Sequence, residues 1–444
     1  MNRRKFLKSS GASVAAFTIL QAGSARTYAA NEKLNIAAIA AGGKAVSGIA
    51  GLASENFVAL ADVDWARAAG TFRKYPKAPR FKDYREMLDK HGKEIDAVII
   101  STPDHHHFHA SMTAIRMGKH VYCEKPLTHS IWEARTLTEA ARKAGVATQM
   151  GNQAQANEQT RVVQEYVMDG AVGQVREAHI WTDRPAKGLF GEYWPQGVGR
   201  PKDKPKVPDT LDWDLWLGPA PERPYHPAYA PRVWRGWWDF GTGALGDIAC
   251  HFFDPVFRAL KLGAPESVEA TSTRINEETY PVGSTITYHF PKRGDMAPVK
   301  LVWYDGGLRP ARPDVVTKGD VMGTNGLLLI GDDGALLSDW NQWRLLPEKR
   351  AKAYGAPPKK LKRSPGHHQE FINACKGGEK AGSNFDWAGP MTETVLLGNV
   401  ALRPQLREDL TKDRLLWDGK SMKFVNHEGA NAFLRREYRK GWEA

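Results

Sequence analysis

Five short apolar runs, separated by amphipathic segments, constrain the fold of this chain more than any other feature of its sequence. They occupy residues 34–40, 57–61, 95–101, 121–123 and 147–150. The intervening segments carry apolar residues at helical spacing, so strands and helices alternate up to about residue 155. This alternation is typical of a parallel sheet with helices on both faces. We therefore predict a doubly wound α/β domain over residues 33–155.

Two helices of this domain carry recognisable signals. Ser130-x-x-Glu133 is a capping box, and Gly145 is placed to end the helix that it starts. The first helix is expected to bury a stripe of four residues, Val46, Ile49, Ala50 and Ala53.

After residue 155 the pattern changes to period-two alternation, which is typical of half-buried antiparallel strands. The strands are expected at residues 175–182, 267–273, 285–290, 299–304, 327–330 and 335–338. We predict an α+β domain with a large, mostly antiparallel, open-faced sheet over residues 156–365. Residues 366–444 are predicted to be a helical segment that packs back on the other domains, since 444 residues exceed what one core usually serves.

Residues 1–30 resemble a twin-arginine signal peptide. Arg3 and Arg4 precede a weakly apolar run, although Asn2 stands where such signals usually have Ser or Thr. The resemblance implies export by the twin-arginine machinery, after folding and cofactor loading, to the periplasm or beyond. The alternative is a disordered basic tail.

The net charge of +12 raises the question of a polyanionic partner. Five of the basic residues lie in the leader, and the remaining ones are scattered apart from a cluster at residues 359–363. We interpret that cluster as a solvated loop and expect no nucleic-acid partner. Cys123, Cys250 and Cys375 are too few and too dispersed for a disulfide framework, so packing roles are expected.

The turn after the first strand reads Ala-Ala-Gly-Gly-Lys-Ala at residues 40–45. It keeps the central glycine of a dinucleotide fingerprint, Gly42, but has alanine at the first glycine position. Asp62 ends the second strand 20 residues after Gly42, where an acidic residue hydrogen-bonds the adenosine ribose. A carboxylate there disfavours a 2′-phosphate, so NAD is expected rather than NADP, with Asp64 as an alternative ribose ligand.

Two motifs carry the residue types that proton and hydride transfer at a carbinol needs. Glu-Lys-Pro at 124–126 follows an apolar strand, and Asp247 precedes His251 by one helical turn. Lysine, imidazole and carboxylate beside a nicotinamide ring are suited to oxidising a sugar hydroxyl. The alternative for Asp247 and His251 is an ordinary pair on a helix surface.

Three segments together resemble the Gfo/Idh/MocA oxidoreductases, relatives of glucose–fructose oxidoreductase and inositol dehydrogenase. They are residues 102–107, 121–130 and 234–251. The resemblance covers roughly residues 33–400 and implies a Rossmann domain followed by an open-faced sheet, commonly used to form dimers or tetramers. It also implies NAD(P)-dependent chemistry on sugars, polyols or glycosides.

Residue roles follow from this resemblance. Lys125 would touch the nicotinamide ribose and the reacting hydroxyl, His251 would be the general base, and Asp247 would orient the substrate. The residues implied in cofactor binding are Gly42, Gly43, Lys44, Asp62, Ser101, Thr102, Pro103, His105, Glu124, Lys125 and Gln153.

A proline-rich stretch from Asp183 to Trp237 is long enough to be a functional cover, and seven of the 15 tryptophans lie between residues 181 and 238. Aromatic faces stack on pyranose rings and arginines bind hydroxyls, carboxylates or sulfates. The substrate-contact candidates are Trp181, Trp234, Trp238, Arg184 and Arg235. The adjacent histidines 105–107 invite a metal site, but their side chains diverge, so packing is favoured and no metal is expected.

The sequence thus predicts an exported, NAD-dependent oxidoreductase acting on a carbohydrate secondary alcohol. Because no free NADH pool exists outside the cytoplasm, the cofactor is expected to stay bound. One alternative is a glycosidase that oxidises a ring hydroxyl transiently; such family members carry Gly-His-Gly-Gly where this chain has Gly-Thr-Gly-Ala at 241–244. A third is a nucleotide-binding protein without activity.

Overall fold

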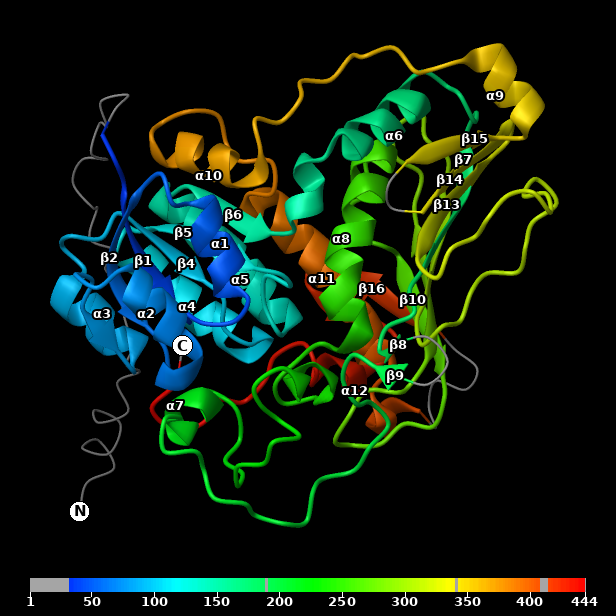
Figure 1. Ribbon diagram of the computed structural model, residues 1–444. Helices are drawn as coiled ribbons and strands as arrows, with labels where there is room; N and C mark the ends of the chain where they lie inside the picture. The colour runs from blue at the N-terminus through cyan, green and yellow to red at the C-terminus, as the bar shows by residue number, and fades with distance from the viewer. Residues whose placement is uncertain (1–31, 188–190, 340–341, 408–413, 444) are drawn as a thin grey trace, which may run out of the picture.

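The computed structural model describes residues 32–187, 191–339, 342–407 and 414–443. The leader prediction for residues 1–30 therefore lies outside the described residues. Two domains stand side by side, with the first sheet and its helices on the left of Figure 1 and a larger sheet on the right. Helices α8 (Gly243–Leu260) and α11 (Phe385–Ala401) lie between the two sheets.

The first sheet has six parallel strands in the order β3-β2-β1-β4-β5-β6. This order is that of a Rossmann fold, so the predicted doubly wound domain is confirmed. The prediction missed only the two-residue strand β3. The strands are β1 (Asn35–Ile39), β2 (Asn56–Ala61), β3 (Arg80–Phe81), β4 (Ala97–Ile100), β5 (His120–Glu124) and β6 (Thr148–Gly151).

Helices cover both faces of this sheet. They are α1 (Ala45–Gly51), α2 (Trp65–Lys74), α3 (Tyr84–His91), α4 (Asp104–Arg116) and α5 (Ile131–Ala144). The capping box of α5 is present, since the Ser130 side chain accepts from the Glu133 amide and the Glu133 side chain accepts from the Ser130 amide. Gly145 follows with a left-handed φ of 65°. Both local signals at the ends of α5 are therefore confirmed.

The predicted buried stripe of α1 was wrong in phase. Val46 is 55% exposed, whereas Ala45, Gly48 and Ile49 are the buried residues of this helix. Gly48 faces Ile99 of β4 so closely that a Cβ at residue 48 would overlap the isoleucine side chain. The close approach of helix to strand, which the sequence pattern does not reveal, sets the side of α1 that is buried.

The second sheet has nine strands in the order β15-β14-β13-β7-β12-β11-β10-β16-β17. All neighbouring pairs are antiparallel except β7 and β12, so the predicted mostly antiparallel sheet is confirmed. The six predicted strands are present within one residue at either end, and β15, β16 and β17 were not predicted. The strands are β7 (Val175–Trp181), β10 (Ser267–Ser272), β11 (Ser284–Phe290), β12 (Val299–Tyr304), β13 (Gly326–Gly331), β14 (Gly334–Ser338), β15 (Trp343–Leu346), β16 (Leu415–Asp418) and β17 (Lys423–Phe424).

Residues 366–444 are helical mainly in their first half. Helices α10 (His367–Cys375) and α11 pack against the first domain, but β16 and β17 then extend the second sheet. The remaining helices of this half are α6 (Glu158–Met168), α9 (Glu348–Tyr354) and the short α12 (Glu428–Asn431), with 3-10 turns at Gln153–Ala156 and Pro404–Leu406. The predicted helical segment of residues 366–444 is thus corrected: its last third returns to the sheet edge.

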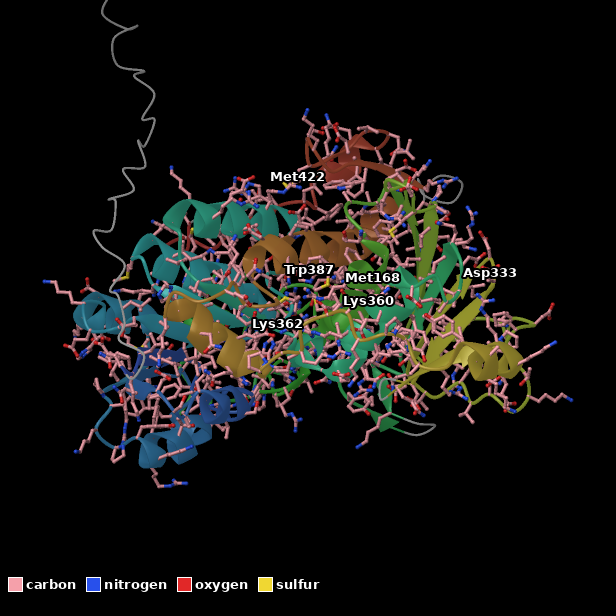
Figure 2. All side chains as sticks on the ribbon, turned by 90° about the horizontal axis from the view of Figure 1, so that it is seen from above. Met168, Asp333, Lys360, Lys362, Trp387 and Met422 are labelled. Carbon is pink, nitrogen blue, oxygen red and sulfur yellow. The ribbon has the colours of Figure 1, made fainter. Side chains whose placement is uncertain are left out.

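Helix α11 joins the two domains through specific contacts as well as through apolar packing on α5 and α8. Arg135 of α5 donates two hydrogen bonds to the Glu393 carboxylate, at 2.8 and 2.6 Å. Trp387, labelled near the middle of Figure 2, donates from Nε1 to Asp254 of α8 at 2.8 Å. These contacts hold α8, which carries one of the predicted catalytic motifs, against the first domain.

The proline-rich stretch runs beneath both domains in Figure 1. Its regular elements are the small ribbon of β8 (Ala186–Lys187) and β9 (Gly191–Glu192), helix α7 (Trp213–Leu217) and a 3-10 turn at Val233–Gly236. It is tied to the first domain where the Asp212 amide donates to Val63 and the Trp65 amide donates to Thr210. The stretch therefore reaches from the second domain across the end of the first sheet.

The basic cluster at residues 359–363 is neutralised by neighbouring carboxylates. Arg363 contacts Glu158 and Glu165, while Lys360 contacts Asp169 at 2.8 Å. Lys360 and Lys362, labelled in Figure 2, lie on the irregular connection between α9 and α10. Among the described residues, no helix is long and apolar enough to cross a membrane.

Candidate active site

A cleft of about 920 Å³ lies where the carboxyl ends of β1, β2 and β4 meet the proline-rich stretch. One end is formed by the turn after β1 and by Asp62, and the other by Asp247 of α8 with aromatic and basic residues of the proline-rich stretch. Ligands of doubly wound sheets bind at this edge of the strands. The position of the cleft is therefore the one expected for a dinucleotide and a second ligand.

The turn after β1 provides a cradle that requires glycine. A Cβ at Gly42 would lie 2.8 Å from the backbone oxygen of Arg67, and one at Gly43, whose φ is 63°, would overlap the Arg67 guanidinium. Both glycines line the cleft. The closeness of backbone to cleft is what a pyrophosphate needs, so these residues fit a dinucleotide.

Ala40 occupies the first position of the fingerprint with a φ of 64°. This left-handed conformation disfavours every residue with a Cβ, and glycine usually stands here. We expect Ala40→Gly to raise the free energy of unfolding by about 1 kcal/mol, because the folded-state strain exceeds the entropy that glycine adds to the unfolded chain. Denaturant unfolding of the two proteins at one temperature measures the difference; a less stable variant would show that Ala40 is not strained.

Asp62 closes the adenosine end of the cradle. Its side chain is 6% exposed and accepts hydrogen bonds from the amides of Gly42 and Asp64, both at 2.8 Å. Burial raises the pKa of Asp62 to about 6, although these amides act in the opposite direction. Two further buried oxygens of the cleft wall, Ser101 Oγ and Thr102 Oγ1, have no hydrogen-bond partner among the described residues. Such groups are suited to ribose hydroxyls and phosphate oxygens.

Lys125 and Asp247 meet at the other end of the cleft, where Asp247 is part of the lining and Lys125 contacts it from just behind the wall. The Lys125 ammonium donates to the Asp247 carboxylate at 2.5 Å and to its backbone oxygen at 2.7 Å. Arg235 donates from Nε to the same carboxylate oxygen at 2.8 Å. Burial acts to raise the pKa of Asp247, but the two cations and their hydrogen bonds outweigh it and hold the pKa well below its usual range. Asp247 is therefore an anion that fixes the lysine.

His251 lies one turn after Asp247 on α8, but it lines a different cavity. That cavity, of about 30 Å³, is enclosed between α6, α8 and strands β13–β15. Burial, together with the charges of Lys125 and Lys44, lowers the pKa of His251 to about 3, against the raising effect of Asp247. The imidazole is therefore neutral at physiological pH and within electrostatic reach of Lys125. The structure brings Lys125 and Asp247 into contact, and it places His251 behind them.

Asp104, which directly precedes the histidines 105–107, was not among the predicted site residues. Its carboxylate is buried and accepts a hydrogen bond of 2.6 Å from the hydroxyl of Thr242, which precedes α8. Burial raises the pKa of Asp104 to about 7, against the lowering effect of Thr242 and of nearby Lys125. This bond joins the start of α4 to the start of α8, the helix that carries Asp247 and His251.

The raised pKa of Asp104 predicts a pH-dependent stability. Folding favours the protonated form, so the contribution is fully present below pH about 4 and is lost as the pH rises to about 7. A shift of this size is worth about 4 kcal/mol. Asp104→Asn keeps the acceptor for Thr242 but does not titrate, so the variant should gain stability relative to the original protein between pH 4.5 and pH 8. Denaturant titrations at both pH values measure this; an unchanged difference would contradict the assignment.

Several predicted ligands do not line the cleft. Trp181 is fully buried in the sheet and donates to the Gly323 carbonyl at 2.9 Å, and Trp238 is buried against Tyr280. Their predicted sugar contacts were therefore wrong, because tertiary packing assigns both rings to the core. His105 is likewise buried, with its ring nitrogens against the carbonyls of Phe240 and Trp216, so it is not a cofactor ligand.

Glu124 and Gln153 lie next to each other just outside the cleft wall. Gln153 donates to Glu124 at 3.1 Å, and Lys44 approaches the same carboxylate at 3.6 Å. The predicted residues that do line the cleft are Gly42, Gly43, Lys44, Asp62, Ser101, Thr102, Pro103, Arg184, Trp234, Arg235 and Asp247.

The histidines 105–107 serve packing in this structure. His107, for example, contacts the carbonyl oxygens of Pro126 and Thr102 through its two ring nitrogens. Among the described residues, no group of three or more histidine, cysteine or carboxylate side chains is arranged to hold a metal ion.

Residues that the sequence did not single out complete the cleft. Tyr193, Trp194 and Arg232 of the proline-rich stretch line the end near Asp247, and Arg67 and Trp442 line the adenosine end. The C-terminal Trp442 stands under the Arg85 guanidinium, which lies 4.0 Å from the ring centre. No local motif marks these residues, since long-range packing alone brings them to the cleft.

The fold and the cleft define a two-domain dinucleotide-binding protein. Residues 32–152 match the model of the Gfo/Idh/MocA oxidoreductase family described as its NAD-binding Rossmann fold, and residues 185–296 match the C-terminal alpha/beta domain of the same family. Together the two matches cover just over half of the chain. The chain belongs to the Gfo/Idh/MocA family of oxidoreductases, and its first domain is of the NAD-binding type.

Curated relatives are similar to parts of the chain. Levoglucosan dehydrogenase of Pseudarthrobacter phenanthrenivorans is 24% identical over 195 residues, 44% of this chain and 40% of that protein. Inositol 2-dehydrogenase of Rubrobacter xylanophilus is 32% identical over 145 residues, 30% of this chain and 41% of that protein. The matches thus span about two fifths of the length of these relatives.

A solved structure matches over most of its length. The WlbA dehydrogenase of Bordetella pertussis, in complex with NADH and UDP-GlcNAcA, has a TM-score of 0.60 at 15% identity, with 87% of this chain and 99% of that chain covered. At this identity the likeness shows the fold alone.

Proposed function

We propose that this protein is an NAD-dependent oxidoreductase that acts on a secondary alcohol of a carbohydrate. The observation that carries the proposal is the contact of Lys125 with Asp247 at one end of a cleft whose other end is a dinucleotide cradle. A bound NAD would accept the hydride of the carbinol carbon. The family membership and the sugar and polyol dehydrogenases among the relatives support the same class.

In this proposal Lys125 binds the reacting hydroxyl and lowers its pKa by its positive charge. Asp247 keeps the ammonium in place, because two hydrogen bonds fix it from one side. The family resemblance implies that His251 accepts the hydroxyl proton, and for this its neutral imidazole would have to reach the cleft from the neighbouring cavity. His251→Asn tests this role, since loss of the base should reduce turnover and remove one limb of its pH profile without releasing NAD.

The test of the proposed function uses the purified full chain. NAD released on denaturation is quantified first, and the protein is then incubated with a panel of sugars, polyols and glycosides. Proton NMR identifies a keto product, and reduced cofactor is followed at the same time. A protein that binds NAD but converts no member of the panel at any pH tested would contradict an oxidoreductase of this substrate class.

The same experiment separates the second candidate, an NAD-dependent glycosidase. That reaction would release free sugar and aglycone without net reduced cofactor. The chain has Thr242 and Ala244 where such family members carry His and Gly, and Thr242 is committed to Asp104. We therefore favour the oxidoreductase.

Export and assembly complete the proposal. We infer from residues 1–30 that the folded, NAD-loaded protein leaves the cytoplasm by the twin-arginine route and retains its cofactor, with a second substrate accepting the hydride. Arg3→Lys with Arg4→Lys should leave the protein in the cytoplasmic fraction. The family resemblance implies a dimer or tetramer, which light scattering of the purified protein would measure; a monomer would contradict it.

A further inference from the structure

Basic and aromatic side chains gather at the Asp247 end of the cleft. The charged residues that line this end are three arginines, Arg184, Arg232 and Arg235, and one carboxylate, Asp247. The three arginines come from the proline-rich stretch, whereas Asp247 comes from α8. Arg184 and Arg232 lie outside the three segments that resemble the family, whereas Arg235 lies inside the third of them.

The arginines are supported by aromatic rings that also face the cleft. The Arg184 guanidinium lies 3.8 Å from the ring centre of Tyr193, and that of Arg235 lies 4.3 Å from Trp234 and 5.7 Å from Trp194. Cation–π stacking holds a guanidinium plane in place and leaves its edge available for hydrogen bonds. These arginines are therefore positioned side chains and not solvated ones.

The carboxylates nearby do not neutralise this end. Asp183 pairs with Arg184 at 2.6 Å, and Asp247 is shared between Arg235 and Lys125. Lys125 adds a fourth positive charge, and His251 is neutral. Two further carboxylates, Asp104 and Glu124, act on Arg235 from behind the cleft wall. The uncompensated charge is therefore that of Arg232, which is exposed at the cleft and has no carboxylate within ion-pair distance among the described residues.

We propose that the substrate carries an acidic group, a carboxylate or a sulfate ester on a pyranose ring, which Arg232 and Arg184 bind while the ring lies against Tyr193, Trp194 and Trp234. Guanidinium groups bind planar or tetrahedral oxyanions in bidentate fashion, and a partly enclosed cleft strengthens the pair. This inference rests on the proposed function and names its substrate class. The oxidised carbon remains a carbinol of the same sugar, next to Lys125.

The test compares three methyl glycosides that share one pyranose ring and differ in the group at C6: methyl β-glucoside, methyl β-glucuronide and methyl β-glucoside 6-sulfate. We expect the NAD-loaded protein to prefer one or both acidic sugars in kcat/KM by about 10-fold or more, an effect of the size of one charge-assisted contact. Rising salt should increase KM for the acidic sugars and leave that for the neutral one unchanged. Preference for the glucuronide or for the sulfate distinguishes the two acidic groups.

Variants then assign the effect to the arginines. Arg232→Ala and the double variant with Arg184→Ala should raise KM for the acidic sugar about 10-fold or more, and by a larger factor than KM for methyl glucoside, with little change in kcat. Arg176→Ala is the matched control, because Arg176 lies on an exposed part of β7 in a pair with Asp332. Calorimetric binding to the NAD-loaded protein reads out the same preference without turnover.

The outcomes separate this inference from the proposed function. Oxidation of neutral and acidic sugars with equal kcat/KM, or an acidic preference that survives in the double variant, would overturn the inference and leave the oxidoreductase intact. Calorimetric binding of the acidic sugar that the double variant loses, without oxidation of any sugar, would support the inference and overturn the proposed function.

Discussion

Lys125→Ala is expected to reduce turnover about 1,000-fold, the range in which a positioned proton-transfer group contributes. Lys125 supplies the only ammonium in contact with Asp247 among the described residues. Arg235 cannot replace this ammonium, because the arginine reaches the carboxylate from the proline-rich stretch. Since Lys125 is 11% exposed and its backbone lies at the end of β5, the variant should fold and keep its NAD. Single-turnover assays of the NAD-loaded variant measure the chemical step directly.

Lys292→Ala, in an exposed turn of the second domain, is the matched control and should have unchanged turnover. Cofactor content and melting temperature must be equal in both variants for the comparison to hold. A Lys125→Ala protein with full activity would show that Lys125 takes no part in the chemistry.

Gly42→Ala is expected to weaken cofactor binding about 100-fold or more, which corresponds to about 3 kcal/mol. The new Cβ would meet the backbone oxygen of Arg67 at 2.8 Å, and a backbone atom at the start of α2 cannot move away as a flexible side chain does. The turn would be pushed into the cleft that the pyrophosphate needs. NAD content after purification, and titration of the emptied protein by fluorescence quenching, measure the loss.

Gly70→Ala is the control. Gly70 lies on helix α2, which also carries Arg67, and a Cβ at residue 70 meets nothing within 4 Å. This control should keep its cofactor and be slightly more stable, since alanine favours a helix interior. Undiminished NAD in the Gly42→Ala protein would show that the turn is not the pyrophosphate site.

The strands and the ends of α5 could be predicted because they depend on local patterns. Alternation of apolar residues predicted the ends of six strands of the second sheet to within one residue. The capping-box residues Ser130 and Glu133 predicted the start of α5. Of the strands that were missed, β3 and β17 have two residues each and β15 and β16 have four. A pair of residues has no periodicity, and only its pairing partner defines it as a strand.

The environment of a single aromatic or histidine side chain could not be predicted. Trp234 lines the cleft while Trp238, four residues later, packs on Tyr280 in the core. Tryptophan is suited to both places, and its sequence neighbours are similar in each case. His251 was expected beside Lys125 in the cleft, but the approach of β13–β15 encloses it in a separate small cavity.

The sequence by itself determined the two-domain order, the dinucleotide turn and the two motifs that meet as Lys125 and Asp247, because each depends on a few residues close together in the chain. Only the tertiary structure decided which side chains share the cleft. Arg232 and Trp442 are more than 200 residues apart, and Asp104 and Thr242 are joined by one hydrogen bond. The packing of whole helices and strands determines such neighbours. Its free energy is a sum over many contacts, and no short sequence pattern reveals it.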